Sequence, residues 1–295
     1  MIVRKAVVPA AGFGTRFLPF TRAVPKELAP LLSKPVIQYV LEEAAASGIE
    51  EVLMIISSGK EAIIRHFNPT PELEMRLEER GKTSLLGELR AIDRIVRIQY
   101  VYQQQLNGLG DAVLCAKEFV GAEPFAVLLG DTVMSSTTDR PITGQLIDAF
   151  AADGRADCVV ALEKVPKERV SSYGIAAGTM ISPDVFKLDE LVEKPSPENA
   201  PGDLAVAARY LFTPEIFAAL ASCPRGKDNE LQLTDAMRLL LGSGRRMLGR
   251  RISGFRHDLG SRIGFLKANV LYGLRDPELK EQFSEFLRHL DNGQC

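Results

Sequence analysis

The segment VVPAAGFGTRFLPFTRAVPKELAP spans residues 7–30 and carries the main evidence for the fold. It begins as a short apolar run, breaks at Gly12 and Gly14, and then carries cations that include Arg16 and Lys26 between prolines. Such a run is typical of a buried β-strand, and glycines after a strand let a ligand approach the backbone closely. The segment predicts a strand followed by an anion-binding loop, with a tight strand-to-helix turn as the plain alternative.

Strand-like and helix-like segments alternate along the rest of the chain. Short apolar runs rich in β-branched or aromatic residues predict strands at 5–10, 51–57, 97–103, 124–131, 157–165 and 204–212. Helical patterns occupy 34–48, 71–92, 108–121, 141–154, 213–221, 229–242, 261–275 and 277–291, and we expect Ser33 to cap the first helix and Gly48 to end it. This order predicts an α/β fold with a mainly parallel central sheet and helices on both faces. Ligands bind beyond the carboxyl ends of the strands in such sheets.

Composition excludes several classes of protein. The 295 residues carry a net charge of −2, which argues against a nucleic-acid surface. The four cysteines (115, 158, 223 and 295) lack metal-ligand spacing, and no apolar run is long enough for a membrane helix. The apolar run near the N-terminus is brief and leads into the glycines, so we interpret it as a strand and not as a signal peptide. We expect a cytoplasmic protein with no nucleic-acid or membrane partner.

Carboxylates and cations at strand ends are the next candidates. Asp131 ends the run PFAVLLGD, where its carboxylate suits Mg²⁺ or, alternatively, starts a turn or caps a helix. Glu193 and Lys194 precede Pro195 at another predicted strand end. A carboxylate there can accept hydrogen bonds from sugar hydroxyls and an ammonium can hold a phosphate. Taken alone, however, the segment favours a solvated Glu–Lys pair in a turn.

Two further polar segments remain open to more than one interpretation. In RHDLGSRIGF, Asp258 suits a second metal carboxylate or a helix cap. His257 suits a base or a local hydrogen-bonding role, and no visible Ser or Cys partner argues for a covalent triad. The stretch QQQLNGLG at 103–110 offers amide donors and acceptors for a base edge, or is simply a polar loop.

Together these motifs resemble a known family. The segment GFGTRFLPFTRAVPKELAP resembles the signature G-x-G-T-R-x-L-P…P-K-E of sugar-1-phosphate nucleotidylyltransferases. Further segments that resemble the family follow in order over nearly the whole chain: KPVIQYVLEEAAASGI, GLGDAVLCA, LGD, SSYGI, VEKP, LAVAARYLF, NELQLTDA and HDLGSR. KPVIQY and LQLTDA are similar to the UTP–glucose-1-phosphate uridylyltransferases of bacteria more than to the related thymidylyltransferases.

The resemblance implies a fold and an activity. The fold would be a Rossmann-like nucleotidyltransferase domain over 1–295, with a nucleotide-binding part (1–135), a sugar-phosphate-binding part (136–260) and C-terminal helices (261–295) that contribute to an oligomer. The activity would be Mg²⁺-dependent, in-line transfer of a uridylyl group from UTP to glucose 1-phosphate, giving UDP-glucose and pyrophosphate. A homodimer or homotetramer is implied, and the apolar stripe of the last helix suits such a contact.

The resemblance also implies roles for single residues. The implied catalytic residues are Arg16, Lys26 and Asp131, and the implied metal ligands are Asp131 and Asp258. The implied nucleotide-binding residues are Ala10, Ala11, Gly12, Gly14, Gln103 and Gly108, and the implied sugar-phosphate-binding residues are Gly174, Glu193 and Lys194.

The chain departs from the family pattern at three positions. Asp111 stands where the family usually has His, Arg22 replaces a usual Lys, and Ala208 replaces a usual Gly. Asp111 lies nearest the expected nucleotide loop and puts its affinity for the base or ribose in question.

Three other functions compete with this interpretation. A nicotinamide dehydrogenase would need a third glycine and an acidic residue after the second strand, where Ser57, Ser58 and Gly59 stand instead. A non-catalytic relative would lack Arg16, Lys26 or Asp131. The same chemistry on another base, such as that of dTTP, or on another sugar is not separated by sequence.

Overall fold

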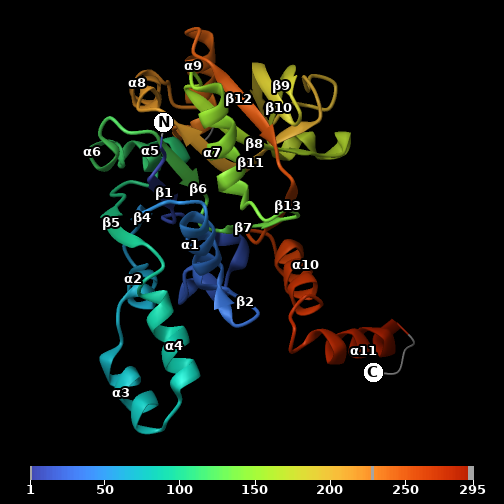
Figure 1. Ribbon diagram of the computed structural model, residues 1–295. Helices are drawn as coiled ribbons and strands as arrows, with labels where there is room; N and C mark the ends of the chain where they lie inside the picture. The colour runs from blue at the N-terminus through green and yellow to red at the C-terminus, as the bar shows by residue number, and fades with distance from the viewer. Residues whose placement is uncertain (1, 227–228, 292–295) are drawn as a thin grey trace.

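The computed structural model describes residues 2–226 and 229–291 and is built on a nine-stranded sheet (Figure 1). Most neighbouring pairs near the start of the chain are parallel, including β1 with β4 and with β6. The strand β11 runs antiparallel to both β6 and β8, and β10 runs antiparallel to β12 and β9, so the sheet as a whole is mixed. The parallel order that the sequence predicts holds for β5, β4, β1 and β6 and for the pair of β8 with β12. In spatial order the strands are β5 (Arg97–Tyr102), β4 (Glu51–Ile56), β1 (Lys5–Pro9), β6 (Phe125–Leu128), β11 (Leu204–Phe212), β8 (Cys158–Lys164), β12 (Met247–Arg251), β10 (Val185–Glu193) and β9 (Gly174–Ser182).

Hydrophobic cores lie on both faces of the sheet. Because side chains alternate along a strand, Val7 joins the core on one face while Ala6 and Val8 join the core on the other. The first core is covered by α5 (Leu109–Leu114), α6 (Lys117–Val120), α8 (Glu215–Ser222) and α9 (Leu233–Gly242). The second is covered by α1 (Val36–Ala46), α2 (Glu61–Phe67) and α7 (Ile142–Asp153). Burial on both faces explains the continuous apolar runs of the central strands.

Several predicted helix limits are wrong. Ser33 does not cap α1, because Lys34 and Pro35 form the strand β3, which pairs with β2 (Pro30–Leu31). The segment 71–92 forms two helices, α3 (Pro71–Glu79) and α4 (Thr83–Ile92), separated near Gly81 with a positive φ of 64°. The segment 108–121 likewise divides into α5 and α6. Gly48 does follow the end of α1 with a φ of 89°, as expected of a helix-ending glycine.

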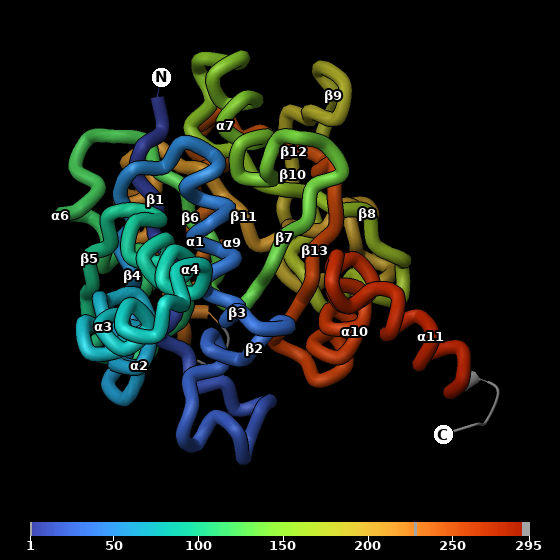
Figure 2. The backbone as a smooth tube through the Cα atoms, turned by 60° about the horizontal axis from the view of Figure 1, so that its bottom comes forward, coloured from blue at the N-terminus to red at the C-terminus, as the bar shows by residue number. Residues whose placement is uncertain are grey.

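Two ribbons and two C-terminal helices complete the structure. The strands β7 (Thr132–Ser136) and β13 (Gly254–Asp258) pair in an antiparallel ribbon. From this ribbon the chain enters α10 (Arg262–Gly273) and α11 (Lys280–Asp291), which extend from the body of the molecule (Figures 1 and 2). Figure 2 shows β2 beside α10, where the Asn269 side chain accepts a hydrogen bond from the Leu32 amide at 3.1 Å. Within the described parts of the chain, no helix has the length and apolar character needed to cross a membrane.

Candidate active site

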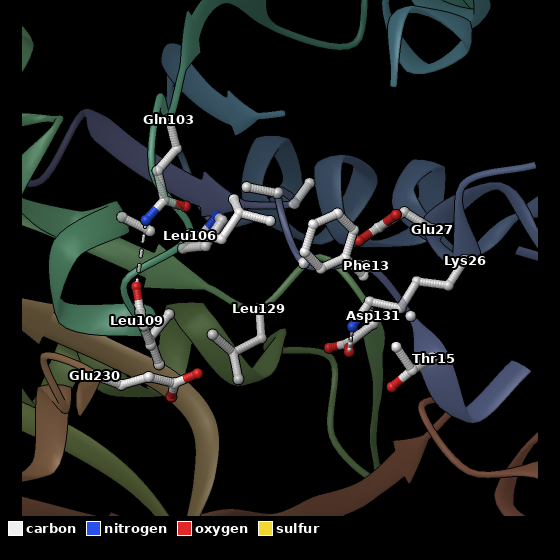
Figure 3. Close-up of a pocket in the computed structure, with 17 residues that line it drawn as sticks. Phe13, Thr15, Lys26, Glu27, Gln103, Leu106, Leu109, Leu129, Asp131 and Glu230 are labelled. Atoms are coloured by element: carbon white, nitrogen blue, oxygen red, sulfur yellow. Dashed lines mark hydrogen bonds and ion pairs between the residues drawn. The ribbon is translucent and has the colours of Figure 1, made fainter. Parts of the chain in front are cut away.

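A cavity of about 550 Å³ opens at the carboxyl ends of β1, β5 and β6 (Figure 3). The loop after β1, Gln103 after β5 and Asp131 after β6 all contribute to its wall. Figure 3 shows Gln103 at one end of the cavity and Lys26 with Asp131 at the other. The lining residues are Pro9, Ala10, Ala11, Gly12, Phe13, Gly14, Thr15, Lys26, Glu27, Gln103, Leu106, Gly108, Leu109, Ala112, Leu129, Asp131 and Glu230. This is the edge of the sheet where an α/β fold binds ligands.

The two glycines of the loop after β1 serve different structural purposes. Gly14 has a φ of 67°, and a Cβ atom at this position would approach Lys26 side-chain carbons at 3.2 Å. Gly12 has open space around it, with no atom within 4 Å of a Cβ. The backbone at Gly12 is therefore accessible from the cavity, whereas Gly14 allows the loop to turn tightly against Lys26.

Lys26 and Asp131 form an ion pair at one end of the cavity. The Nζ atom of Lys26 donates to Oδ2 of Asp131 at 2.5 Å, although the residues are 105 positions apart. Burial alone would lower the pKa of Lys26, but the carboxylates of Asp131 and Glu27 outweigh it and raise that pKa. Burial would likewise raise the pKa of Asp131, and the Lys26 ammonium lowers it overall. Both groups are therefore charged at neutral pH.

A second carboxylate lies beside Asp131. The β7–β13 ribbon pairs Thr132 with Asp258, which brings Asp258 next to the end of β6. A Cβ atom at Gly260 would lie 3.1 Å from Oδ1 of Asp258 and 3.5 Å from Oδ2 of Asp131. Hard oxygen donors of this kind suit Mg²⁺, and in the described residues no cluster of three or more metal-ligating side chains is present.

The sequence interpretation assigned no role to a buried ion pair beneath the loop. Lys60 Nζ donates to both carboxylate oxygens of Glu27 at 2.8 Å and to the Ala10 carbonyl at 2.6 Å. Glu27 is 1% exposed and Lys60 is 7% exposed. Burial raises the pKa of Glu27 and lowers that of Lys60, while each partner opposes the shift of the other. Two features of the sequence could have indicated this ion pair: Glu27 directly after Lys26, and the cation Lys60 just beyond the carboxyl end of β4.

Arg16 lies at the rim of the cavity. Its side chain is exposed, and it follows Gly14 and Thr15, which line the wall. The positive charge of Arg16 is close enough to Lys26 to lower the pKa of that lysine slightly, which is the smallest of the effects on this pKa. The Arg262 guanidinium donates to the Arg16 and Leu18 carbonyls at 3.3 Å and ties α10 to this loop.

The other end of the cavity is built around Gln103 and Gly108. Gln103 is 6% exposed, and its amide nitrogen donates to Asp111 Oδ2 at 2.7 Å. Gly108 has a φ of 103°, and a Cβ atom there would lie 2.8 Å from the Leu231 carbonyl. This close approach holds the loop against the segment that precedes α9.

The predicted sugar-phosphate residues also lie together. Strand register places Gly174 opposite Glu193, and a Cβ atom at Gly174 would lie 3.2 Å from Glu193 Oε2. Lys194 has a positive φ of 45°, and its Nζ atom lies 3.2 Å from Glu193 Oε1. Thr234 of α9 lies 3.5 Å from the same Gly174 position. The start of α9 thus connects this cluster to the Gln103 end of the cavity.

His257 has a hydrogen-bonding role. Its Nε2 atom lies 2.9 Å from Ser135 Oγ across the β7–β13 ribbon, a partner that the sequence pattern did not reveal. Burial lowers the pKa of His257. In the described ranges 2–226 and 229–291, no carboxylate hydrogen bond to His257 completes a triad.

The chain is similar to proteins of known activity over nearly its full length. The sequence profile of the nucleotidyl transferase family matches residues 5–273. A UTP–glucose-1-phosphate uridylyltransferase of Bacillus subtilis (strain 168) is 46% identical over 285 residues, which cover 97% of this chain and 94% of the relative. Another from Streptococcus pneumoniae serotype 4 (strain ATCC BAA-334 / TIGR4) is 44% identical over 98% of this chain and 96% of its own.

A solved structure agrees with this similarity. A UTP-bound UGPase from Acinetobacter baumannii has a TM-score of 0.90 at 36% identity, covering 98% of this chain and 100% of its own. The profile match, the two relatives and this structure all span far more than half of the chain. The protein therefore belongs to the nucleotidyl transferase family, among the UTP–glucose-1-phosphate uridylyltransferases.

Proposed function

We propose that the protein transfers the uridylyl group of UTP to α-D-glucose 1-phosphate, producing UDP-glucose and pyrophosphate. The main support is the near full-length likeness to a UTP-bound UGPase and to a UDP-glucose pyrophosphorylase complexed with UDP-glucose. The second of these has a TM-score of 0.84 at 35% identity, covering 93% of this chain and 100% of its own. The cavity described above supplies the cations and carboxylates that such a transfer needs.

The reaction needs no protein nucleophile. A phosphate oxygen of glucose 1-phosphate attacks the α-phosphorus of UTP, a new P–O bond forms, and the bond to the pyrophosphate oxygen breaks. Lys26 would neutralise charge on the triphosphate from its fixed position beside Asp131, and Arg16 would approach from the rim. Ala10, Ala11, Gly12 and Gly14 would give the nucleotide close access to the backbone.

Asp131 and Asp258 would hold Mg²⁺. Both side chains offer hard oxygen ligands on the same side of Gly260, and Asp131 keeps its Oδ1 atom available beside a long contact of 3.4 Å to Thr132. When bound, the ion would neutralise phosphate charge and support departure of pyrophosphate. The ion pair with Lys26 holds the Asp131 carboxylate in place for this role.

The positions of the residues suggest which part of each substrate they would contact. Gln103 and the backbone at Gly108 would contact the uracil base at the end of the cavity away from Lys26. Glu193 would accept hydrogen bonds from glucose hydroxyls, Lys194 would hold the sugar phosphate, and Gly174 would offer a backbone contact. The short distances from Gly174 to Glu193 and Thr234, and from Glu193 to Lys194, support a single sugar-phosphate site.

We also propose a homodimer or homotetramer formed through the C-terminal helices. An apolar hollow lies between α10 and α11, and Leu266, Leu279 and Phe286 beside it are 61%, 45% and 48% exposed. Exposed apolar groups that gather on one surface mark association sites. A cytoplasmic location is a further proposal, supported by free thiols at Cys115, Cys158 and Cys223 among the described residues.

The experiment is a substrate matrix scored by pyrophosphate release. The purified protein is given UTP, dTTP, CTP or ATP with glucose 1-phosphate or another sugar 1-phosphate, with and without Mg²⁺. We expect the highest kcat/KM for UTP with glucose 1-phosphate and a requirement for Mg²⁺. A higher kcat/KM for dTTP would favour the thymidylyl alternative, and no turnover of any pair would favour a non-catalytic relative.

A further inference from the structure

We propose that Asp111 is a positioning residue that fixes the orientation of the Gln103 amide and thereby selects the base. The proposal rests on the function proposed above and extends it to a specificity mechanism. Asp111 lies in the first turn of α5, and its carboxylate contacts Gln103 at the end of the cavity away from Lys26.

Two acceptors hold the nitrogen of the Gln103 amide. Nε2 donates to Asp111 Oδ2 at 2.7 Å, and it also approaches the Gly108 carbonyl at 3.4 Å. An ionised carboxylate and a backbone carbonyl can accept hydrogen bonds but cannot donate them. The opposite orientation of the amide would place its oxygen against both acceptors, so these contacts favour the observed orientation.

The fixed orientation leaves the amide oxygen toward the cavity. Figure 3 shows the Gln103 nitrogen directed toward Leu109 and the oxygen directed toward Leu106, and both leucines line the cavity. Gln103 is 6% exposed, and Leu106, Leu109 and Ala112 supply apolar surface nearby. A buried acceptor among apolar groups favours a ligand that brings a donor.

Uracil brings that donor and cytosine does not at the same position. The N3 atom of uracil carries a hydrogen, whereas N3 of cytosine is an acceptor in its neutral form. An acceptor opposed to Oε1 of Gln103 would leave two buried groups without partners. Because thymine also carries N3–H, this contact would separate UTP from CTP but would not separate UTP from dTTP.

Asp111→Asn tests the proposal because its side chain has nearly the same shape but can both donate and accept. Gln103 is then free to turn and present its nitrogen to the cavity. We expect the ratio of kcat/KM for UTP to that for CTP to fall about tenfold or more, since an unpaired buried polar group typically costs that much. Glu88→Gln is the matched control, because it removes one negative charge on the exposed surface of α4 and should leave the ratio unchanged.

A second variant exchanges the two chemical groups. In Gln103→Glu/Asp111→Asn, the amide at 111 can donate to the carboxylate at 103, whose other oxygen still faces the cavity. We expect the UTP preference to return part of the way toward the wild-type ratio, because the carboxylate oxygen that accepts from the amide at 111 also lies against the Gly108 carbonyl. A merely structural role for Asp111 does not predict any such return. An unchanged ratio in folded Asp111→Asn, or no recovery in the folded double variant, would overturn the proposal.

Melting temperatures show whether each variant is folded, and the double variant carries the test if Asp111→Asn is unfolded. If the wild type turns over no substrate pair, the proposed function fails on its own. Calorimetric affinities for UTP and CTP then replace kcat/KM, and the same change of ratio in Asp111→Asn is expected. Equal UTP and CTP affinities in the wild type would also overturn the proposal.

Discussion

At the scale of single residues, Lys26 is the cation that the structure fixes directly in the wall of the cavity. Its ammonium is held by Asp131 and is positioned before any substrate arrives. We expect Lys26→Ala to lower kcat by about 10²–10³, because a preorganised charge at a transition state contributes on this order. Steady-state kinetics with UTP and glucose 1-phosphate measure the effect. Lys34→Ala is the control, since Lys34 pairs with Glu42 outside the cavity, and equal losses for both variants would contradict the assignment.

Ala208 is a non-glycine residue in a left-handed backbone conformation, which strains the chain. It has a φ of 58° in β11, within the irregular register between Val206 and Tyr210. A side chain in this region costs about 1–2 kcal/mol, which glycine avoids. Ala207→Gly is the matched control, because Ala207 is equally buried and both changes remove one methyl group. We expect Ala208→Gly to be the more stable variant by about 1–2 kcal/mol in urea unfolding, and equal stabilities would exclude strain at Ala208.

At the scale of elements, the Glu27–Lys60 pair ties the short helix Lys26–Leu28 to the residue that precedes α2. Lys60 also donates to the Ala10 carbonyl, so the pair anchors the start of the loop that follows β1. We expect Lys60→Met to lower the free energy of unfolding by about 3–5 kcal/mol, because it leaves the Glu27 carboxylate buried and unpaired. Glu27→Leu/Lys60→Met should recover most of that loss in the same urea titration. A double variant as unstable as the single one would show that packing, and not the unpaired charge, dominates.

At the scale of the whole molecule, the C-terminal helices are the expected site of assembly. Phe283 packs against Gly273 of α10, where a Cβ atom would lie 2.9 Å from its ring, while Phe286 on the same helix is largely exposed. We expect light scattering to give a mass of two or four chains of 32.3 kDa, and Phe286→Glu to shift it toward one chain. Glu285→Gln should leave the mass unchanged because Glu285 is an exposed polar neighbour. A wild-type protein that is a single chain at micromolar concentration would contradict the assembly.

The sequence by itself predicted the elements whose burial is locally uniform. The strands β1, β4 and β6 were recognised because parallel strands covered on both faces have continuous apolar patterns. The edge strand β5 is only partly buried and was recognised from its β-branched and aromatic residues. The polar residues that follow them, Lys26 and Asp131 among them, were recognised because strand ends converge on one edge of the sheet. By contrast, β9 and β10 were missed because residues 178–182 of β9 are exposed on both faces and β10 has exposed charged residues at 187, 189 and 190, which weakens the apolar pattern.

The tertiary structure decided which distant groups meet. Lys26 pairs with Asp131, and Asp258 joins them only because β13 pairs with β7. The Glu27–Lys60 pair and the Gln103–Asp111 hydrogen bond were likewise decided by loop conformation. Periodicity along the chain reports whether a side chain is buried, but it carries no record of the strand order and turn geometry that choose its partner.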